Sequence, residues 1–327
     1  MKFKIDPLLQ AMAVAIALAF IYPPLGASGG PLYLDTVTHY GIGLVFFLHG
    51  AALSRQSLVD GLRSWRLHLL VQSSTFLVFP LAGFAIYFLT APGWLTENGL
   101  LTPDLRLGLF FLSAVPSTIA GSIAVTMIAR GNLPAAIFNA TISGLIGMVL
   151  TPALVGVVVA TGGTELDVLS AIVDVFLTLL LPFAIGHLLR PWIGATLTRH
   201  KRVVSIIERG VVVLIVYVAF CNSAQARVWA TAGVWVVLAV GMLVVLWLVA
   251  ALAYNRAVAC KLGFSTEDEI VALFCGTQKS LANGAPIANI LFAGWPGLSM
   301  ILLPLILYHQ LQLLFCVALA QRYAQRH

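Results

Sequence analysis

Long apolar stretches alternate with short polar segments along the whole chain, and this pattern predicts membrane-spanning helices. A helix needs about 20 mostly apolar residues to cross the hydrocarbon core of a bilayer, where helical hydrogen bonding satisfies every backbone N–H and C=O group. Ten stretches come close to this length, and only short connections separate them. The sequence therefore predicts an all-α polytopic membrane protein with ten transmembrane helices. The predicted helices cover residues 8–26, 38–54, 67–90, 105–130, 133–160, 168–190, 205–223, 231–255, 269–293 and 297–321.

Two of these helices contain the same unusual interruption. Small, polar, glycine and proline residues break the fourth helix between Ala114 and Ser122 and the ninth helix between Gly276 and Pro286. Proline and glycine disfavour continuous helix, and backbone groups freed at membrane depth must be buried in protein or line a cavity. For either break taken alone, an ordinary kink at a close helix–helix contact is the alternative interpretation.

The two breaks occupy matching places in the two halves of the chain. Pro116 and Gly276 are 160 positions apart, as are the predicted starts of the first and sixth helices. The chain therefore divides into two five-helix repeats, residues 1–160 and 161–327. Because five is odd, the second repeat enters the membrane from the opposite side, so the repeats are inverted. Paired interrupted helices in inverted repeats indicate the binding site of a transporter.

Composition supports the membrane interpretation. Apolar residues make up 60% of the 327 residues and charged residues only 9%, against about 45–50% and about 25% in soluble domains. The net charge of +6 is basic, and a basic balance can indicate a nucleic-acid partner. Here the basic residues lie in the gaps between apolar stretches, so the expected partner is the lipid bilayer and no nucleic acid.

The distribution of Lys and Arg predicts the orientation in the membrane. With the N-terminus in the cytoplasm, 15 of the 18 basic residues fall on the cytoplasmic side, while Arg106 and Arg227 fall outside and Lys279 lies within a helix. Cytoplasmic loops carry an excess of Lys and Arg, and one spurious or missed helix would destroy this bias. We therefore predict a multi-pass inner-membrane protein with both termini in the cytoplasm.

Lys279 is the most informative single residue of the sequence. A lysine near the bilayer midplane costs about 2.5–3.5 kcal/mol on insertion scales, and such residues usually face an interior cavity or a partner. One interpretation is a fixed cation, held among unwound carbonyls and helix C-termini in place of a sodium ion. The other is a functional group that releases its proton during a transport cycle or contacts an anionic substrate.

The polar residues in and near the breaks should converge on one buried region, because half-helix ends at membrane depth need polar partners. Asn139 and Ser143 share a face of the fifth helix by their spacing, and either a binding site or a helix–helix hydrogen bond explains an Asn there. His309 either lines a cavity or is satisfied between helices. The candidate substrate- or ion-binding residues are Ser117, Thr118, Ser122, Asn139, Thr141, Ser143, Thr277, Gln278, Lys279, Ser280, Asn283 and His309.

Several motifs resemble the bile acid:sodium symporter family over nearly the whole chain, and most of all its branch of sodium/bile acid cotransporter 7 and bacterial relatives. The motifs are Val115-Pro116-Ser117-Thr118, Ala129-Arg130-Gly131-Asn132, Ala136-Ile137-Phe138-Asn139-Ala140, Phe46-Phe47-Leu48-His49-Gly50, Gly276-Thr277-Gln278-Lys279-Ser280-Leu281 and Leu303-Pro304-Leu305-Ile306-Leu307-Tyr308-His309. The resemblance implies a panel domain of helices 1, 2, 6 and 7 and a core domain of helices 3–5 and 8–10. It also implies that helices 4 and 9 cross at their unwound midpoints and that substrate enters between panel and core.

The resemblance also implies a sodium-binding pattern that this chain keeps only in part. The bile acid branch binds two sodium ions with a Ser-Asn pair after the helix 4 break, hydroxyls on helix 5, and a Glu followed four positions later by Gln on helix 9. A sodium site near Ser122, Thr141 and Gln278 stays open, since these residues match. Ile123, however, stands at the asparagine position and Phe274 at the glutamate position. The anionic ligand that both sodium ions would share is therefore missing.

These observations predict a secondary active transporter of a small organic, anionic solute that works by alternating access between panel and core. No cofactor is expected, and either sodium or a proton is open as the coupling ion. An enzyme is not expected, because no HExxH, GxSxG or paired-aspartate signature lies in a predicted helix. The alternative is a membrane regulator of ion homeostasis without substrate flux. No pattern in the sequence indicates an oligomeric state.

Overall fold

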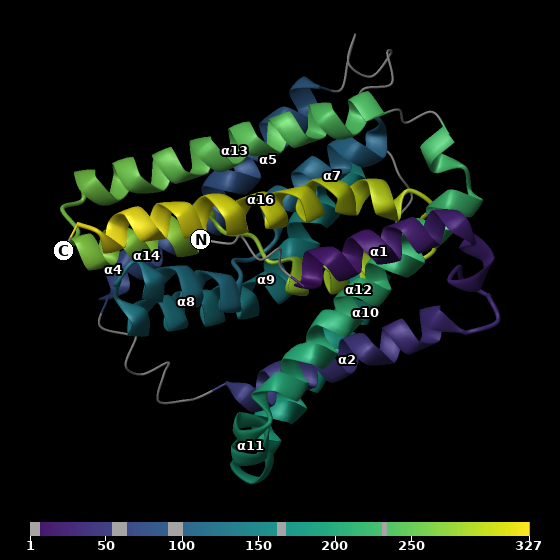
Figure 1. Cartoon of the computed structure of the whole chain (residues 1–327), viewed down its shortest axis with the longest axis horizontal. Helices are drawn as coiled ribbons and strands as arrows, with labels where there is room; N and C mark the ends of the chain where they lie inside the picture. The colour runs from purple at the N-terminus through teal and green to yellow at the C-terminus, as the bar shows by residue number, and fades with distance from the viewer. Residues whose placement is uncertain (1–6, 54–63, 91–100, 162–167, 231–233, 327) are drawn as a thin grey trace. The chain divides into compact units, whose positions relative to one another are not determined.

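Helices form all the regular structure that the computed structural model describes, in residues 7–53, 64–90, 101–161, 168–230 and 234–326 (Figure 1). The chain folds into two compact units, each made of separate stretches of sequence. Unit 1 comprises Met1–Leu53, Glu165–Gly233 and Ala285–Leu302, and unit 2 comprises Ser54–Thr164, Val234–Gly284 and Leu303–His327. The chain is therefore an all-α protein in its described part, as the sequence predicts.

Many of these helices are long and apolar enough to cross a membrane. Within the described ranges six helices meet this criterion, and a bent pair of shorter helices adds a seventh. The six are Trp65–Leu89, Leu133–Thr161, Val173–Arg199, Lys201–Gln225, Trp235–Lys261 and Leu298–Ala324. The predicted helices 8–26, 38–54 and 269–293 coincide with shorter or less apolar helical segments. The chain is thus a multi-pass membrane protein, while ten crossings stay a prediction.

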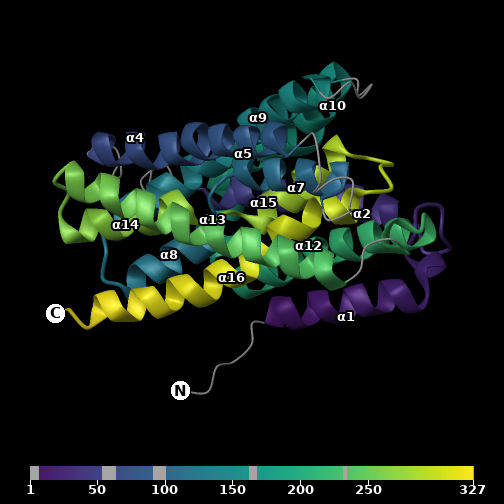
Figure 2. The same cartoon turned by 90° about the horizontal axis from the view of Figure 1, so that it is seen from above.

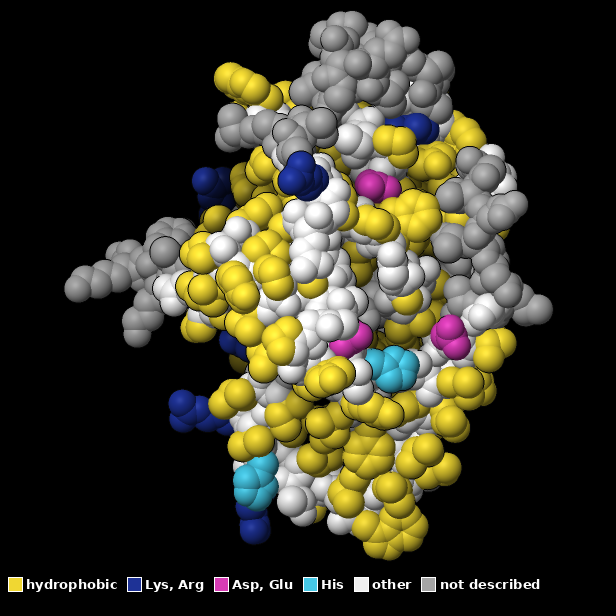
Figure 3. Space-filling view, turned by 90° about the vertical axis from the view of Figure 1, so that its right-hand side faces the viewer, with side chains coloured by type: hydrophobic (Ala, Val, Ile, Leu, Met, Phe, Trp, Pro, Cys, Tyr) yellow, Lys and Arg dark blue, Asp and Glu magenta, His cyan; other side chains and the backbone are white. Residues whose placement is uncertain are grey.

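The surface agrees with a lipid environment. Hydrophobic side chains are spread over the described part of the face drawn in Figure 3, with only scattered Lys, Arg, Asp, Glu and His among them. Large apolar residues such as Leu188, Met242 and Leu246 are more than half exposed on long helices. Apolar patches of this extent are rare on soluble monomers. Lipid tails can cover them without cost.

Unit 1 is built from helices that pack along one another in pairs. Helix α1 lies along α12, and α2 lies along α11 and also contacts α12 (Figure 1). The elements of unit 1 are α1 (Pro7–Ile21), η1 (Pro23–Leu25), α2 (Leu34–Ala52), α10 (Val168–Val175), the π-helix η4 (Phe176–Leu180), α11 (Leu181–Arg199), α12 (Lys201–Gln225) and η5 (Val228–Ala230).

Two glycines let α2 and α11 touch backbone to backbone. A Cβ added at Gly50 would overlap the carbonyl of Phe183, and a Cβ added at Gly186 would overlap the carbonyl of Phe47. Small residues at such crossings allow the close approach on which helix association in lipid depends. Phe-x-x-Gly therefore recurs on both helices and forms a reciprocal contact.

Unit 2 is organised around α14, which contacts α4, α8, α9 and α13 (Figure 2). The elements that it holds in whole or in part are α4 (Trp65–Ser73), the π-helix η3 (Ser74–Val78), α5 (Phe79–Leu89), α7 (Pro103–Ala114), α8 (Ile119–Ile128), α9 (Leu133–Thr161), α13 (Val234–Lys261), α14 (Thr266–Thr277), α15 (Leu281–Leu291) and α16 (Leu298–Ala324). Helix α15 continues into unit 1, and helix α16 begins in unit 1 and continues into unit 2.

The fourth and ninth predicted helices are interrupted, but over fewer residues than the sequence suggests. The non-helical segments are residues 115–118, where the chain bends by 57°, and residues 278–280. Within the interrupted stretches, the sequence predicts non-helical backbone over Pro116–Ser122 and Gly276–Gly284, and this prediction is wrong at its edges. Helix restarts early because the Ser280 hydroxyl accepts from the Asn283 N–H, which caps the first turn of α15.

Candidate functional site

The two helix breaks lie against each other inside unit 2. The Ser280 N–H donates a hydrogen bond to the Pro116 carbonyl at 2.8 Å, which joins the second break directly to the first. Val115 and Gln278 both have extended backbone and end the preceding helices α7 and α14. Four half-helices therefore begin or end around one buried point.

Lys279 occupies this point. Its side chain is only 1% exposed, and its Nζ donates to the carbonyls of Ser113 at 2.7 Å, Val115 at 2.9 Å and Thr75 at 3.3 Å. An ammonium has three N–H donors and no acceptor, whereas a neutral amine would turn its lone pair toward one of these oxygens. Three acceptors around one nitrogen match the three N–H donors of an ammonium, which would lie at the negative C-terminal end of α7.

An aromatic ring and a π-helix complete the surroundings of the ammonium. The Lys279 Nζ lies 5.0 Å from the centre of the Phe79 ring, within the range of a cation–π contact. The Phe79 N–H donates to the Ser74 carbonyl, five residues back, and Pro80 has no N–H. The Thr75 carbonyl is therefore left without a helical donor, and the Lys279 ammonium supplies one.

The backbone of Lys279 is held by a glutamine that the sequence analysis missed. Gln312 on α16 accepts from the Lys279 N–H and donates to the Lys279 carbonyl, both at 2.8 Å. His309, one turn earlier, lies 3.0 Å from the Gln312 amide nitrogen and is 8% exposed. His309 is thus satisfied between helices. The spacing of three residues from His309 could have pointed to Gln312.

The C-terminal end of α14 is capped by neutral side chains. The Tyr308 hydroxyl donates to the Thr277 carbonyl at 2.8 Å, and the Asn255 amide donates to the Thr277 hydroxyl at 3.3 Å. Asn255 is fully buried on α13, and its side-chain oxygen packs on Gly276, where a Cβ would overlap it. The sequence analysis missed Asn255, although an Asn within a long apolar helix was a usable signal.

A chain of hydroxyl and amide groups links the first break to α9 and to the second break. The Ser117 N–H donates to the Ser143 hydroxyl at 2.9 Å, and the Ser117 and Ser122 hydroxyls are 3.3 Å apart. Ser122 donates to the Gln278 side-chain oxygen at 3.0 Å. These four candidates therefore converge as the sequence analysis expects of break residues.

The remaining candidates take more peripheral places. Asn139 bonds to His68 at 2.9 Å and accepts from Gln72 at 3.3 Å, so it ties α9 to α4. Thr118 is buried at the end of the first break, Asn283 is buried in the first turn after the second break, and Thr141 is half-buried on α9. For Asn139 the helix–helix hydrogen bond is the interpretation that the contacts favour.

The residues at the family's sodium positions supply few side-chain oxygens for a sodium ion. Phe274 is fully buried in an apolar cluster that includes Val125, Leu273 and Tyr323. The Ile123 side chain offers no oxygen, and two of the three matching residues, Ser122 and Gln278, are bonded to each other. Sodium favours several oxygen ligands with compensating charge. In the described part of the chain no cluster of three His, Cys, Asp or Glu side chains could hold a metal ion.

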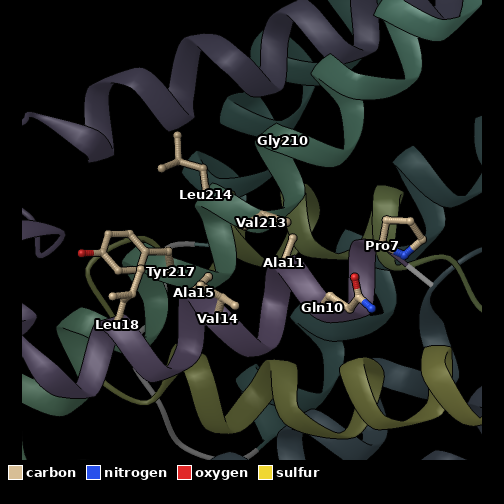
Figure 4. A pocket seen from close by; sticks show the side chains of 10 residues that line it. All are labelled: Pro7, Gln10, Ala11, Val14, Ala15, Leu18, Gly210, Val213, Leu214 and Tyr217. Carbon is tan, nitrogen blue, oxygen red and sulfur yellow. The ribbon is translucent and has the colours of Figure 1, made fainter. Parts of the chain in front are cut away.

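A separate groove of about 560 Å³ lies in unit 1 between α1 and α12 (Figure 4). Its lining is mostly apolar, with Gln10 and Tyr217 as the polar exceptions. None of the candidate residues from the sequence lies there. The groove fits contact with lipid tails better than binding of a polar solute.

A multi-pass all-α protein in which two interrupted helices meet at a buried polar centre has the architecture of a secondary transporter. Comparison with known proteins assigns the family. The model of the SBF-like CPA transporter family matches residues 6–325, so the chain belongs to this family of transporters. The resemblance drawn from the sequence motifs is confirmed.

Relatives from bacteria and animals support the same assignment. The chain is 37% identical over 322 residues to the putative symporter YfeH of Escherichia coli, covering 98% of this chain and 94% of that protein. It is 30% identical over 308 residues to sodium/bile acid cotransporter 7 of Mus musculus, covering 94% and 88%. It is 42% identical over 325 residues to the uncharacterized protein PA2026 of Pseudomonas aeruginosa, covering 99% and 95%.

Proposed function

We propose that this chain is a secondary active transporter of a small organic anion that works by alternating access in the inner membrane. The observation that carries the proposal is the contact between the two helix breaks around a buried ammonium. Half-helix ends at membrane depth are the usual binding elements of such transporters. The names of two relatives, a putative symporter and a sodium/bile acid cotransporter, support the same function.

The moving parts of this transporter would be a panel domain of helices 1, 2, 6 and 7 and a core domain of helices 3–5 and 8–10. The separation into unit 1, with α1, α2, α11 and α12, and unit 2, with α4, α7, α9 and α13, supports this assignment. The proposal keeps the two inverted repeats, residues 1–160 and 161–327, as the origin of the matched breaks.

In this proposal Lys279 is a permanent internal cation, and transport does not use two sodium ions. Two unit charges about 4 Å apart repel by about 4 kcal/mol at an effective dielectric near 20, which would weaken sodium binding by about three orders of magnitude. Proton release from Lys279 would turn a lone pair toward one of the three carbonyls. The fixed cation is therefore favoured over the proton carrier.

The proposed contacts of the transported anion are the polar groups at the breaks. Ser117 and Thr118 directly precede α8, and Ser280 directly precedes α15. The N-terminal N–H groups of both helices favour negative charge. Lys279 contributes a positive potential from within the protein and needs no direct contact with the solute.

Uptake into proteoliposomes tests the proposed function. Radiolabelled bile acid and a panel of small carboxylates would be offered with a sodium or a choline gradient, at two fixed pH values on either side of neutrality. We expect saturable uptake of at least one anion that persists in the wild type when choline replaces sodium and is lost in Lys279→Met but kept in Lys261→Met.

Two results would overturn parts of the proposal. Uptake that requires sodium and survives Lys279→Met would disprove the fixed-cation role. Absence of uptake for every anion, with stable protein in the vesicles, would favour the non-transporting regulator of ion homeostasis.

A further inference from the structure

The groups around the Lys279 ammonium form a cradle of their own. We define the cation cradle as the carbonyls of Thr75, Ser113 and Val115 together with the Phe79 ring, all of which the ammonium contacts. Backbone carbonyls that replace a hydration shell bind monovalent cations in channel filters, and aromatic faces bind organic ammonium ions. The cradle combines both kinds of ligand.

The carbonyls of the cradle are freed by their own backbone, independently of Lys279. The helical partner of the Ser113 carbonyl would be the Ser117 N–H, but this N–H donates to the Ser143 hydroxyl. The Val115 carbonyl lies in the break after α7. The Thr75 carbonyl is released by the π-helix η3 and by Pro80, which has no N–H. Without Lys279, these three buried carbonyl oxygens would have no hydrogen-bond donor, which would strongly favour the binding of a cation.

We propose that the cation cradle is a monovalent-cation site in its own right and that the Lys279 side chain is its tethered occupant. A small primary ammonium ion should enter the cradle when the tether is removed. The inference rests on the proposed function only in treating Lys279 as a fixed cation. None of the ligands of the cradle belongs to the sodium pattern around Ser122, Phe274 and Gln278.

The chemistry of the cradle selects among cations. Lys279→Ala removes three carbons and the ammonium, which is the size of n-propylammonium. Such an ion can donate three N–H groups to three carbonyls while its alkyl chain fills the space that the Lys279 side chain occupies in the wild type. Tetramethylammonium has no N–H donor, and sodium gains little from the Phe79 ring. The expected order of binding is n-propylammonium, then methylammonium, then sodium and potassium, with tetramethylammonium last.

Thermal unfolding of the purified full-length protein tests the site without any transport assay. n-Propylammonium chloride would be titrated into Lys279→Ala at constant ionic strength, with tetramethylammonium chloride as the matched salt. We expect a saturable rise of a few degrees in the unfolding midpoint of Lys279→Ala, since a ligand that binds only the folded state stabilises it. Neither the wild type nor Lys279→Met should respond, because the side chain at position 279 fills this space in both.

The double variant Lys279→Ala with Pro80→Ala tests whether n-propylammonium binds in the cradle. The alanine introduced in place of Pro80 would bring a backbone N–H that competes for the Thr75 carbonyl. The concentration of n-propylammonium at half-maximal stabilisation should therefore rise several-fold. An equal shift in wild type, in Lys279→Met or with tetramethylammonium would overturn the proposal.

A second measurement covers the case in which Lys279→Ala does not fold. Phenylalanine analogues with increasing fluorination, placed at position 79 in the chain that retains Lys279, weaken the negative face of the ring with little change in shape. A stepwise fall of the unfolding midpoint with fluorine number is expected, and an unchanged midpoint would contradict a cation in the cradle. These unfolding measurements do not depend on transport. The proposed cation site and the proposed transport function can therefore fail separately.

Discussion

At the residue scale, this chain differs from the family's sodium pattern in two charges. It lacks the carboxylate that would bind sodium, and it carries a lysine ammonium at the second helix break. The carboxylate position holds Phe274, which fills an apolar cluster, while Lys279 provides a positive charge among backbone carbonyls. Each change would be costly alone. Without the carboxylate, a sodium ion would lack a compensating negative charge, and without the three carbonyls, the Lys279 ammonium would lack hydrogen-bond acceptors. Together they leave a satisfied site.

Removal of the ammonium should destabilise unit 2 strongly. Lys279→Met keeps most of the side-chain volume but leaves three buried carbonyls without donors. A buried hydrogen-bonding group that is left without its partner costs about 1–3 kcal/mol. Denaturant unfolding in detergent should show this loss, whereas Lys261→Met, at an exposed lysine on α13, should change the free energy of unfolding by less than about 0.5 kcal/mol. Equal stability of the two variants would contradict the assigned hydrogen bonds.

Restoring the family's carboxylate should not restore sodium binding. Phe274→Glu places an unpaired acid among Val125, Leu273 and Tyr323 and should cost several kcal/mol. We expect its unfolding midpoint to be equal in sodium chloride and potassium chloride. Phe274→Leu serves as the control for lost volume. A rise specific to sodium in the glutamate variant would show that a sodium site persists.

At the element scale, the helices depart from a regular α-helix where a backbone group lacks a hydrogen-bond partner. Both described π-helices end two residues before a proline, Pro80 after η3 and Pro182 after η4, so missing N–H groups coincide with the wider turns. The breaks after α7 and α14 work in the same way, because released carbonyls there accept from Lys279 and Tyr308. Irregular backbone is tolerated at these places because the freed carbonyls of Thr75, Ser113, Val115 and Thr277 are paired inside the protein.

The glycine contact between α2 and α11 gives a prediction at this scale. Gly50→Ala and Gly186→Ala would each push a Cβ into the carbonyl of the opposite helix, so both should lower the yield of folded protein and its unfolding midpoint. Gly210→Ala on α12 is the matched control, because its Cβ would meet nothing within 4 Å. Size-exclusion profiles and thermal unfolding in detergent report both effects. Tolerance of alanine at Gly50 and Gly186 would disprove the close approach.

At the scale of the whole molecule, the chain returns repeatedly to each of its two units. Unit 1 takes three stretches of sequence and unit 2 takes three others, so neither can form until the second half of the chain is present. This interleaving is what two inverted repeats that share a panel and a core would produce.

The predicted topology can be tested by reporter fusions. Alkaline phosphatase fused after Leu262 or after residue 327 should be inactive, because both points are predicted to be cytoplasmic, and after Gly294 it should be active. Green fluorescent protein should give the reverse pattern. The physical reason is the excess of Lys and Arg in cytoplasmic segments. Any two neighbouring fusion points with the same reporter activity would contradict ten crossings.

The sequence by itself determined the class of the protein and the places where its helices break. A bilayer imposes local requirements, namely apolar runs of helical length and basic residues at one side, and these can be read along the chain. The breaks near Pro116 and Gln278 were likewise visible, because proline, glycine and small polar residues act on their own backbone. The predicted family resemblance rested on motifs of the same local kind.

Only the tertiary structure decided what each polar side chain touches. Lys279 and Thr75 are 204 positions apart, and their hydrogen bond exists because a π-helix frees one particular carbonyl at the place where the ammonium arrives. Gln312 and Asn255 gained their roles in the same way, through contacts across helices that no local pattern specifies. Hydrogen-bond partners depend on the packing of distant segments to within a few tenths of an ångström, and helical periodicity does not encode that packing.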